Sequence, residues 1–516
     1  MADVAASTVP GFTTRRLLLV LLALIMAVFL ASMETSIIAT ALPTIAGDFN
    51  AFESLAWVGT AYIATSAIGT PLLGKLSDLY GRRLIFQTTM ATFVVGSLLC
   101  GIAPSMGWLI AFRALQGIGG GGIQALAFAI LGDILPPRER GRFIGYFTLS
   151  FVGAALIGPV IGGVIIDHFD WAWIFLINVP LGLLVMVACH YALRLPFQRR
   201  EAKLDLVGAA LLSVAVGSLM IGLAQGGEEG WTESFVLGLF AVSLVTTAVF
   251  IVVERRVPEP MIPLRLFGNR VMLVCIALGT CAGVVTYGAG NFLPTYFQVS
   301  RFVDPTVSGL RMAPQMLGVS LATFGIGRLI ARTGRYRVFP IIGTAVSTVG
   351  LLSVAQIDGD ISYWWLVVPM VFMGFGAASV FTTTSIAGQN AVEFRDLGVA
   401  TSTMMFFRSL GGAFGYAAFG TILNATIRSD VPARTGLTGD EAMGSIRQPA
   451  VIKKLEPAVR SAITDSVATG VSRIYWVCGA VMAIGFLIAL ALPEKPLRMR
   501  AGLSDAMEGK EPATAS

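Results

Sequence analysis

Two charged residues, Glu34 and Arg113, lie deep inside apolar stretches of the sequence. Counted back from Pro43 along a helix, Glu34 is about 13 Å inside the run 17–42, and Arg113 lies near the start of the run 108–131. A charge at the centre of a membrane costs about 2.5–3.5 kcal/mol, so such residues mark functional sites. Burial favours the protonated form of an acid, and a carboxylate suits a buried arginine. The pair predicts a proton-binding site. The alternatives are a Glu34 side chain that reaches water and an Arg113 that only bonds backbone carbonyls.

A second group of charges fills the ten-residue link "GKLSDLYGRR" between two apolar runs. Its two glycines allow close helix approach and a tight turn, while its acid and bases can bond neighbouring helix ends. We expect a latch that holds this side of the protein shut, and the alternative is a plain basic turn. Asp133, followed by "PPRER", is expected to complete the latch and to assist proton coupling. The latch residues are Gly74, Asp78, Gly81, Arg82 and Arg83.

Glycines also cluster in the run 143–166, as Gly158-Pro159-x-x-Gly162-Gly163. Small residues let membrane helices approach closely, and proline removes a backbone hydrogen bond and permits a bend. We expect this run to pack tightly against a neighbouring helix.

Aromatic and polar residues in several apolar runs are candidates for a substrate cavity, because aromatic faces attract lipophilic cations. Packing or lipid contact is the alternative for each of them. Arg408 is a further buried base without a partner that the sequence identifies. The candidates are Tyr62, Phe151, Tyr287, Asn291, Phe406, Phe407 and Arg408.

The elements that position these residues are long apolar segments. Of the 516 residues, 55% are hydrophobic and 13% are charged, whereas soluble domains carry about 25% charged residues. An apolar run of eighteen or more residues can cross a bilayer as a helix. The sequence therefore predicts an all-α integral membrane protein in contact with the lipid bilayer. Fourteen spans are expected: 17–42, 55–73, 84–102, 108–131, 143–166, 174–193, 204–225, 235–253, 270–297, 308–330, 338–356, 363–389, 398–423 and 474–492.

Lys and Arg gather in alternate links, which predicts that both termini, residues 1–16 and 493–516, are cytoplasmic. The external segment 424–473 is basic, which its length allows. Its stretch Pro449 to Thr469 could form an amphipathic cap or a solvated linker, and we expect the linker.

The two halves of the sequence repeat each other. The link "GKLSDLYGRR" recurs as "GRLIARTGRY" at an offset of 253, with Ala331 in the place of Asp78. Gly117, Gly119, Gly141 and Gly158 match Gly374, Gly376, Gly398 and Gly415 at an offset of 257. Two six-helix halves, 17–193 and 270–492, are therefore expected, with two extra spans within 194–269. Substrate sites of such repeats lie near the membrane midplane between the halves.

These motifs together resemble the major facilitator superfamily, in particular its fourteen-span drug:proton antiporters. The resemblance rests on Gly74-x-Leu76-x-Asp78-x-x-Gly81-Arg82-Arg83, Arg113-x-x-Gln116-Gly117-x-Gly119, the 158–163 glycines, "METSIIATALP" and "WIFLINVPLG". One departure is Glu34 where that branch has Asp; another is that spans nine to thirteen hold no acid. The resemblance implies the major facilitator fold and a proton-driven exporter of hydrophobic, often cationic compounds in the inner membrane of a bacterium. It also implies a monomer that needs no cofactor besides the coupling proton.

Other functions remain as alternatives or are disfavoured. A dedicated exporter of one metabolite, lipid or siderophore would share every motif. A membrane enzyme is disfavoured because no Ser-His-Asp or metal-binding spacing occurs, and no phosphate-binding loop indicates ATP as the energy source. The positions of the bases follow membrane topology rather than nucleic-acid binding.

Overall fold

The computed structural model describes residues 14–49, 51, 54–193, 205–228, 230–290, 292–358, 361–393, 396–437, 452 and 455–497, and these residues form helices and turns without a strand. Ten of the described helices are long and apolar enough to cross a membrane. The helices α3 (Leu55–Tyr80) and α15 (Ala313–Thr333), with two shorter apolar helices, bring the described part of the chain to the fourteen predicted spans.

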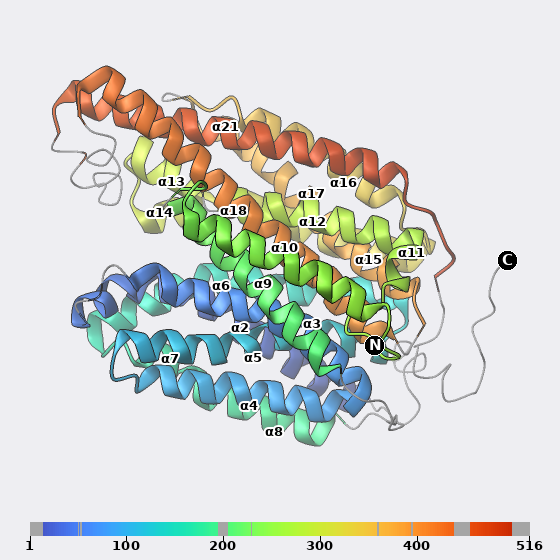
Figure 1. Cartoon of the computed structure of the whole chain (residues 1–516). Helices are drawn as coiled ribbons and strands as arrows, with labels where there is room; N and C mark the ends of the chain where they lie inside the picture. Colours follow the sequence, from blue (N-terminus) through green and yellow to red (C-terminus); the bar gives the residue numbers. More distant parts are fainter. Residues whose placement is uncertain are drawn as a thin grey trace.

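Seven helices make up the first half, drawn in blue to cyan in Figure 1. Besides α3 they are α2 (Thr14–Asp48), α4 (Arg82–Gly101), α5 (Met106–Ile134), α6 (Pro137–His168), α7 (Trp173–Leu176) and α8 (Asn178–Ala192). The turn between α3 and α4 is a single residue, Gly81, with a φ of 94° that glycine adopts readily. This confirms the predicted tight turn.

The second half has the same general plan and is drawn in yellow to red. Its elements besides α15 are α12 (Arg270–Gly290), α13 (Phe292–Thr295), the π-helical turn η2 (Tyr296–Ser300), α14 (Pro305–Arg311), α16 (Val338–Val354), α17 (Tyr363–Asn390), α18 (Leu397–Thr435) and α21 (Pro457–Leu490). The predicted span 308–330 begins within α14 and continues in α15 after Met312, and the predicted span 270–297 ends in the π-helical turn η2. The predicted span 174–193 holds α7 and α8, which are joined by Ile177 in a helical conformation.

The expectation of a solvated linker from Pro449 to Thr469, within the segment 424–473, is wrong for the described residues of that stretch. The helix α18 continues to Thr435, where Gly436 ends it with a φ of 73°, and α21 begins already at Pro457. Ile463, Val467 and Val471 are buried in the core of the second half. An apolar face on this part of α21, spaced by four residues, therefore packs against the protein, although the segment as a whole is basic. Residues 438–451, 453 and 454 lie outside the described residues.

The two extra helices, α9 (Leu206–Glu228) and α10 (Ser234–Glu254), lie along the seam between the halves (Figure 1). The helix α9 packs against both α3 and α18. One apolar cluster joins Leu212, Val216 and Met220 of α9 to Ala67 of α3 and Phe406 of α18. A short helix, α11 (Arg265–Gly268), connects α10 to the second half.

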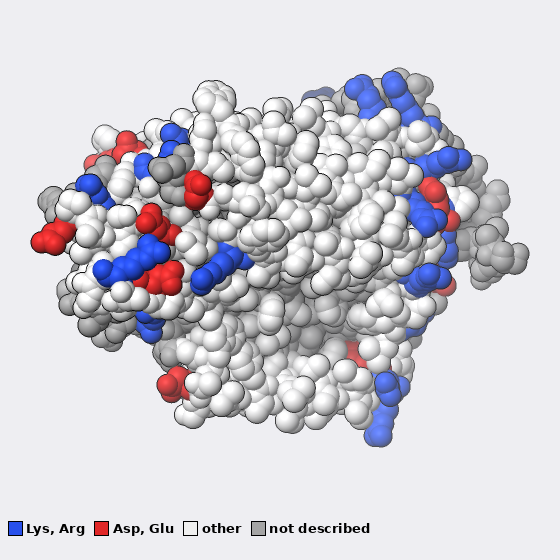
Figure 2. Space-filling view, turned by 90° about the horizontal axis from the view of Figure 1, so that it is seen from above, with Lys and Arg blue, Asp and Glu red and all other residues white. Residues whose placement is uncertain are grey.

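We call the end of the bundle that holds Gly81, Arg82 and Arg140 the latch end, and the opposite one the far end. The halves lie close together at the latch end and diverge toward the far end, on the left of Figure 1. Figure 2 shows an uncharged surface between the two ends, with Lys and Arg gathered at the latch end on the right. An uncharged belt of this kind suits a protein that spans the bilayer.

The repeat seen in the sequence reappears as equivalent helix contacts. A Cβ atom on Gly141 of α6 would lie 2.7 Å from Gly327 of α15, and a Cβ on Gly74 of α3 would lie 3.3 Å from the carbonyl of Gly398 of α18. Gly74 and Gly327 are repeat partners, and so are Gly141 and Gly398. Both contacts join one half to the other at the latch end, so the repeated glycines let four helices meet there.

Candidate functional site

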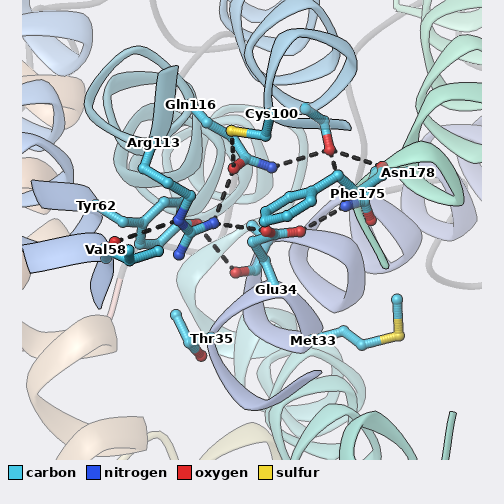
Figure 3. A network of polar contacts seen from close by, with 12 residues as sticks. Met33, Glu34, Thr35, Val58, Tyr62, Cys100, Arg113, Gln116, Phe175 and Asn178 are labelled. Atoms are coloured by element: carbon cyan, nitrogen blue, oxygen red, sulfur yellow. Dashed lines mark hydrogen bonds and ion pairs between the residues drawn. The ribbon is translucent and has the colours of Figure 1, made fainter. Parts of the chain in front are cut away.

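A buried ion pair between Glu34 and Arg113 lies inside the first half (Figure 3). The nitrogen Nη1 of Arg113 is 2.5 Å from Oε1 of Glu34, and the side chains are 1% and 0% exposed. Because a buried charge is stable only when it is paired, the mutual placement explains how both residues are tolerated in apolar helices. The predicted partnership of the two residues is present in the structure.

Other polar groups complete the surroundings of this pair. Arg113 also donates through Nη1 to Oε1 of Gln116 at 2.8 Å and through Nε to the carbonyl of Val58 at 3.4 Å. Its guanidinium lies over the Tyr62 ring, 4.3 Å from the centroid. On the other side, Nδ2 of Asn178 donates to Oε2 of Glu34 at 2.5 Å. Each charge of the pair therefore has a second polar partner.

Asn178 and Ser97 are members of this network to which the sequence analysis assigned no role. Asn178 is the first residue of α8, and its Nδ2 also donates to Oγ of Ser97 at 3.0 Å. Ser97 in turn accepts from Nε2 of Gln116 at 3.0 Å and donates to the carbonyl of Phe175 at 2.8 Å. The motif "WIFLINVPLG" holds Asn178 and is the one sequence signal that could have identified it.

The latch joins the first half to the start of α18 in the second. Oδ2 of Asp78 accepts a hydrogen bond from the backbone N–H of Val399 at 2.8 Å. The first N–H groups of a helix have no partner within the helix and carry partial positive charge. Asp78 therefore caps α18 from the other half of the protein.

Arg82 holds Asp78 in place. Its Nη1 is 2.5 Å from Oδ1 of Asp78, and its Nε donates to Oδ2 of Asp133 at 2.6 Å. Asp78 lies beyond the predicted span 55–73, and burial raises the pKa of its carboxyl to about 6, although the Arg82 guanidinium lowers it. The structure thus brings Asp133 into the latch, as expected. For Arg83, half-buried at the start of α4, the described residues provide no hydrogen-bond partner.

A further contact across the halves lies beside the latch. Nη1 of Arg140, on α6, donates to Oε1 of Gln389 of α17 at 3.1 Å, and Nε2 of Gln389 donates to the carbonyl of Phe128 at 3.2 Å. Gly398 lets Asp78 and Arg82 approach α18 closely, because a Cβ there would collide with both side chains. The latch end is closed in this conformation.

The glycines of the 158–163 motif pack α6 against α2. A Cβ on Gly158 would lie 3.3 Å from the backbone nitrogen of Ile37 and would collide with Oγ of Ser36. A Cβ on Gly162 would lie 3.0 Å from the carbonyl of Ile37. Gly163 differs, since a Cβ there would meet nothing within 4 Å, and Pro159 is exposed on the outside of a continuous α6. Two of the four motif residues therefore make the expected close contact.

The cavity candidates do not come together in one place. Tyr62 belongs to the Glu34 network, Phe406 packs in the cluster with the extra helices, and Phe407 contacts Phe267 with ring centroids 5.8 Å apart. Phe151 is half-buried on α6. The Tyr287 side chain and Asn291 lie outside what the structure describes.

Arg408 lines a pocket formed by α12, α17 and α18 of the second half. Its guanidinium lies over the Phe381 ring, 4.1 Å from the centroid, and Met404, Met405 and Thr384 line the same pocket. An aromatic ring, two flexible methionines and a cation make a surface that can take an apolar compound with a polar end.

The sequence of this protein matches those of known membrane proteins. A family model described as Major Facilitator Superfamily matches residues 24–416. The chain belongs to the major facilitator superfamily. Among major facilitator proteins, it is 35% identical to the Multidrug transporter protein MdtP of Bacillus subtilis over 80% of this chain and 76% of that one. It is 32% identical to Multidrug resistance protein 3 of the same organism, over 91% and 92% of the two chains.

A solved major facilitator structure confirms the fold. The proton:xylose symporter XylE bound to a sugar analogue matches with a TM-score of 0.61 and 14% identity, covering 96% of this chain and 100% of that one. The major facilitator fold predicted from the motifs is therefore correct. This chain is a multi-pass membrane transporter and not an enzyme.

Proposed function

We propose that this transporter is a proton-driven exporter of small hydrophobic, often cationic compounds. The observation that carries the proposal is the fully buried Glu34–Arg113 pair. It is a carboxylate that can exchange a proton, held by a cation and by Asn178 in a part of the protein that is otherwise apolar. The names of the relatives MdtP and Multidrug resistance protein 3 support export of drugs.

Protonation of Glu34 is the coupling step in this proposal. A neutral Glu34 no longer attracts the guanidinium, while Arg113 keeps Gln116, the Val58 carbonyl and the Tyr62 ring. The proton thus loosens α2 from α5, and the buried Arg113 charge, which has lost its carboxylate, is then held by these three neutral contacts alone. Proton entry through the membrane potential supplies about 2.3 kcal/mol per charge per 100 mV.

The latch sets the direction of access in this proposal. The Lys and Arg side chains at the latch end favour a cytoplasmic position for that end and for both termini, in a bacterial inner membrane. The observed conformation is then closed to the cytoplasm and faces outward. Asp133, which shares Arg82 with Asp78, is placed to relay charge changes between the latch and α5. We expect the protein to act as a monomer with the proton as its only coupling ion.

Ethidium efflux from loaded cells tests the proposal. Efflux by the wild type should stop when a protonophore is added and should be lost in Glu34→Gln, which mimics the protonated acid. Glu233→Gln, an exposed acid at the far end of α10, is the matched control and should export normally. Efflux that persists with the protonophore would refute proton coupling. Export of a single compound from a broad panel would instead favour a dedicated exporter.

A further inference from the structure

Two buried carboxylates lie at the latch end of the extra helices, apart from the Glu34 network. Asp205 directly precedes α9 and is 8% exposed, and Glu254 is the last residue of α10 and is 4% exposed. Neither residue belongs to a motif that pointed to function in the sequence. Acids at such positions are rarely buried unless they are paired.

One oxygen of each carboxylate has a structural task. Oδ1 of Asp205 accepts from the backbone N–H of Gly208 at 2.8 Å and caps α9. Oε1 of Glu254 accepts from the backbone N–H of Met261 at 2.9 Å and holds the link that follows α10. The other two oxygens, Oδ2 of Asp205 and Oε2 of Glu254, are buried and have no hydrogen-bond partner in the described part of the chain.

The two carboxylates approach each other beside Gly208. A Cβ on Gly208 would lie 3.1 Å from Oε1 of Glu254 and would collide with Oδ2 of Asp205. A glycine is therefore required where α9 passes between the acids. Two negative charges this close together in a buried place repel each other, and the repulsion is relieved when one cation is held between them.

Few other charges of the described residues face the pair. Lys75 of α3 is near enough to act on Glu254 through its field, but its Nζ is 2.9 Å from Oε2 of Glu259, in the link after α10. Arg255 and Arg256 are exposed, and Arg265 of α11 pairs with Asp396 at 2.8 Å. Among the described residues, the neighbourhood therefore supplies one partly engaged cation for two buried acids.

A metal ion does not fit this place. Calcium takes six to eight oxygen ligands and magnesium demands an octahedron. The described residues contain no group of three His, Cys, Asp or Glu side chains that could hold a metal. A proton on one carboxyl group removes one of the two negative charges and needs no further ligand.

We propose that Asp205 and Glu254 form a second proton-binding site, in which one proton taken from the solvent at the latch end is shared by the two carboxyl groups. Lys75 lies in the latch link between Gly74 and Asp78, so its ion pair with Glu259 connects this site to the latch. The extra helices thereby supply a proton site that a twelve-helix arrangement lacks. The site stands independently of export and of Glu34.

The test is the melting temperature of the purified full-length protein in lipid nanodiscs, measured from about pH 5 to about pH 8. A proton that binds the folded state more tightly than the unfolded state stabilises at low pH, and this contribution is lost as pH rises. The difference in melting temperature, Glu254→Gln minus wild type, should therefore increase with pH. Asp205→Asn should show the same trend, because asparagine also caps a helix. The double variant should add little to either.

Two more variants separate the proposal from a structural role. Glu233→Gln, at the opposite end of α10, should give a difference that does not change with pH. Lys75→Gln removes the nearby positive charge and should move the wild-type transition to higher pH, which a merely structural pair of acids would not do. A pH-independent difference for both Glu254→Gln and Asp205→Asn would overturn the proposal. So would stabilisation of the wild type, but not of Glu254→Gln, by added calcium or magnesium at constant pH.

Discussion

The two members of the Glu34–Arg113 pair should differ in what their removal costs. In Arg113→Met, Glu34 loses its cation and keeps only neutral partners such as the Asn178 amide. In Glu34→Gln, Arg113 keeps Gln116 at 2.8 Å, the Val58 carbonyl and the Tyr62 ring. Methionine is a realistic replacement because Met370, fully buried, stands at the equivalent position of the second half.

These contacts give the magnitudes. Removing one partner of a buried ion pair costs about 3–5 kcal/mol, and we assign this cost to Arg113→Met because it strands a carboxylate. Glu34→Gln keeps a carbonyl oxygen that can accept from Arg113, and Arg113 keeps its other contacts, so we assign this variant the smaller cost of a weakened hydrogen bond, about 1–3 kcal/mol. After one charge has been removed, removal of the second destabilises the protein less. The double variant should therefore cost less than the sum of the two single variants, by about 1–3 kcal/mol.

The free energy of unfolding, measured by SDS titration in mixed micelles and followed by tryptophan fluorescence, compares the four proteins. Proton release on addition of substrate, followed with a pH-sensitive dye, should be absent from Glu34→Gln and from the double variant. A Glu34→Gln variant less stable than Arg113→Met would refute the assignment of partners. Costs that add fully in the double variant would show that the two side chains do not act as a pair.

Three further predictions concern the latch, the glycine motif and Asn178. Burial raises the pKa of Asp78 to about 6 in the closed latch, above the value of about 3.9 in water. Closure of the latch therefore takes up a proton, and acidification through pH 6 should favour the closed form. Spin-label distances across the latch end should show this shift in the wild type, and Asp78→Asn, with reduced export, should lack it. Gly158→Leu should destabilise the protein by about 1–3 kcal/mol and impair export. Gly163→Leu should be close to the wild type in thermal unfolding, because a Cβ there meets nothing within 4 Å. Asn178→Ala should shift the pH profile of export, whereas Asn178→Gln, which keeps an amide N–H donor, should restore part of the activity. An unchanged profile would remove Asn178 from the proton site.

Much of this architecture was predictable because a membrane imposes strong rules on sequence. Apolar length identified the spans, and the depth of Glu34 and Arg113 identified the pair, since a charge in lipid has few possible partners. The acid in the latch link was informative for a similar reason, because a basic turn alone does not require Asp78. Motif spacing then gave the fold, which the family match and the structure of XylE confirm.

The sequence could not predict contacts made by groups that many residue types share. Asp78 bonds the backbone N–H of Val399, and every non-proline residue has such a group. Asn178 and Ser97 are ordinary uncharged residues whose role depends on the packing of α8 and α4 beside Glu34. The packing of 457–473 against the second half was not expected, because the charges of this stretch conceal its apolar face.

The repeat shows how packing and chemistry are divided between the halves. The glycine contacts are kept in both: Gly117 of α5 packs on α3 as Gly374 of α17 packs on α15, and Gly158 packs on α2 as Gly415 packs on α12. The charges are not kept, because Met370 stands in the place of Arg113 and Ala331 in the place of Asp78. Two halves with the same helix packing can rock against each other about the crossing points at Gly74 and Gly141. Because Glu34, Arg113 and the latch acids belong to the first half, protonation of Glu34 in the proposed mechanism changes the energy of that half, and the second half contributes the matching helix packing.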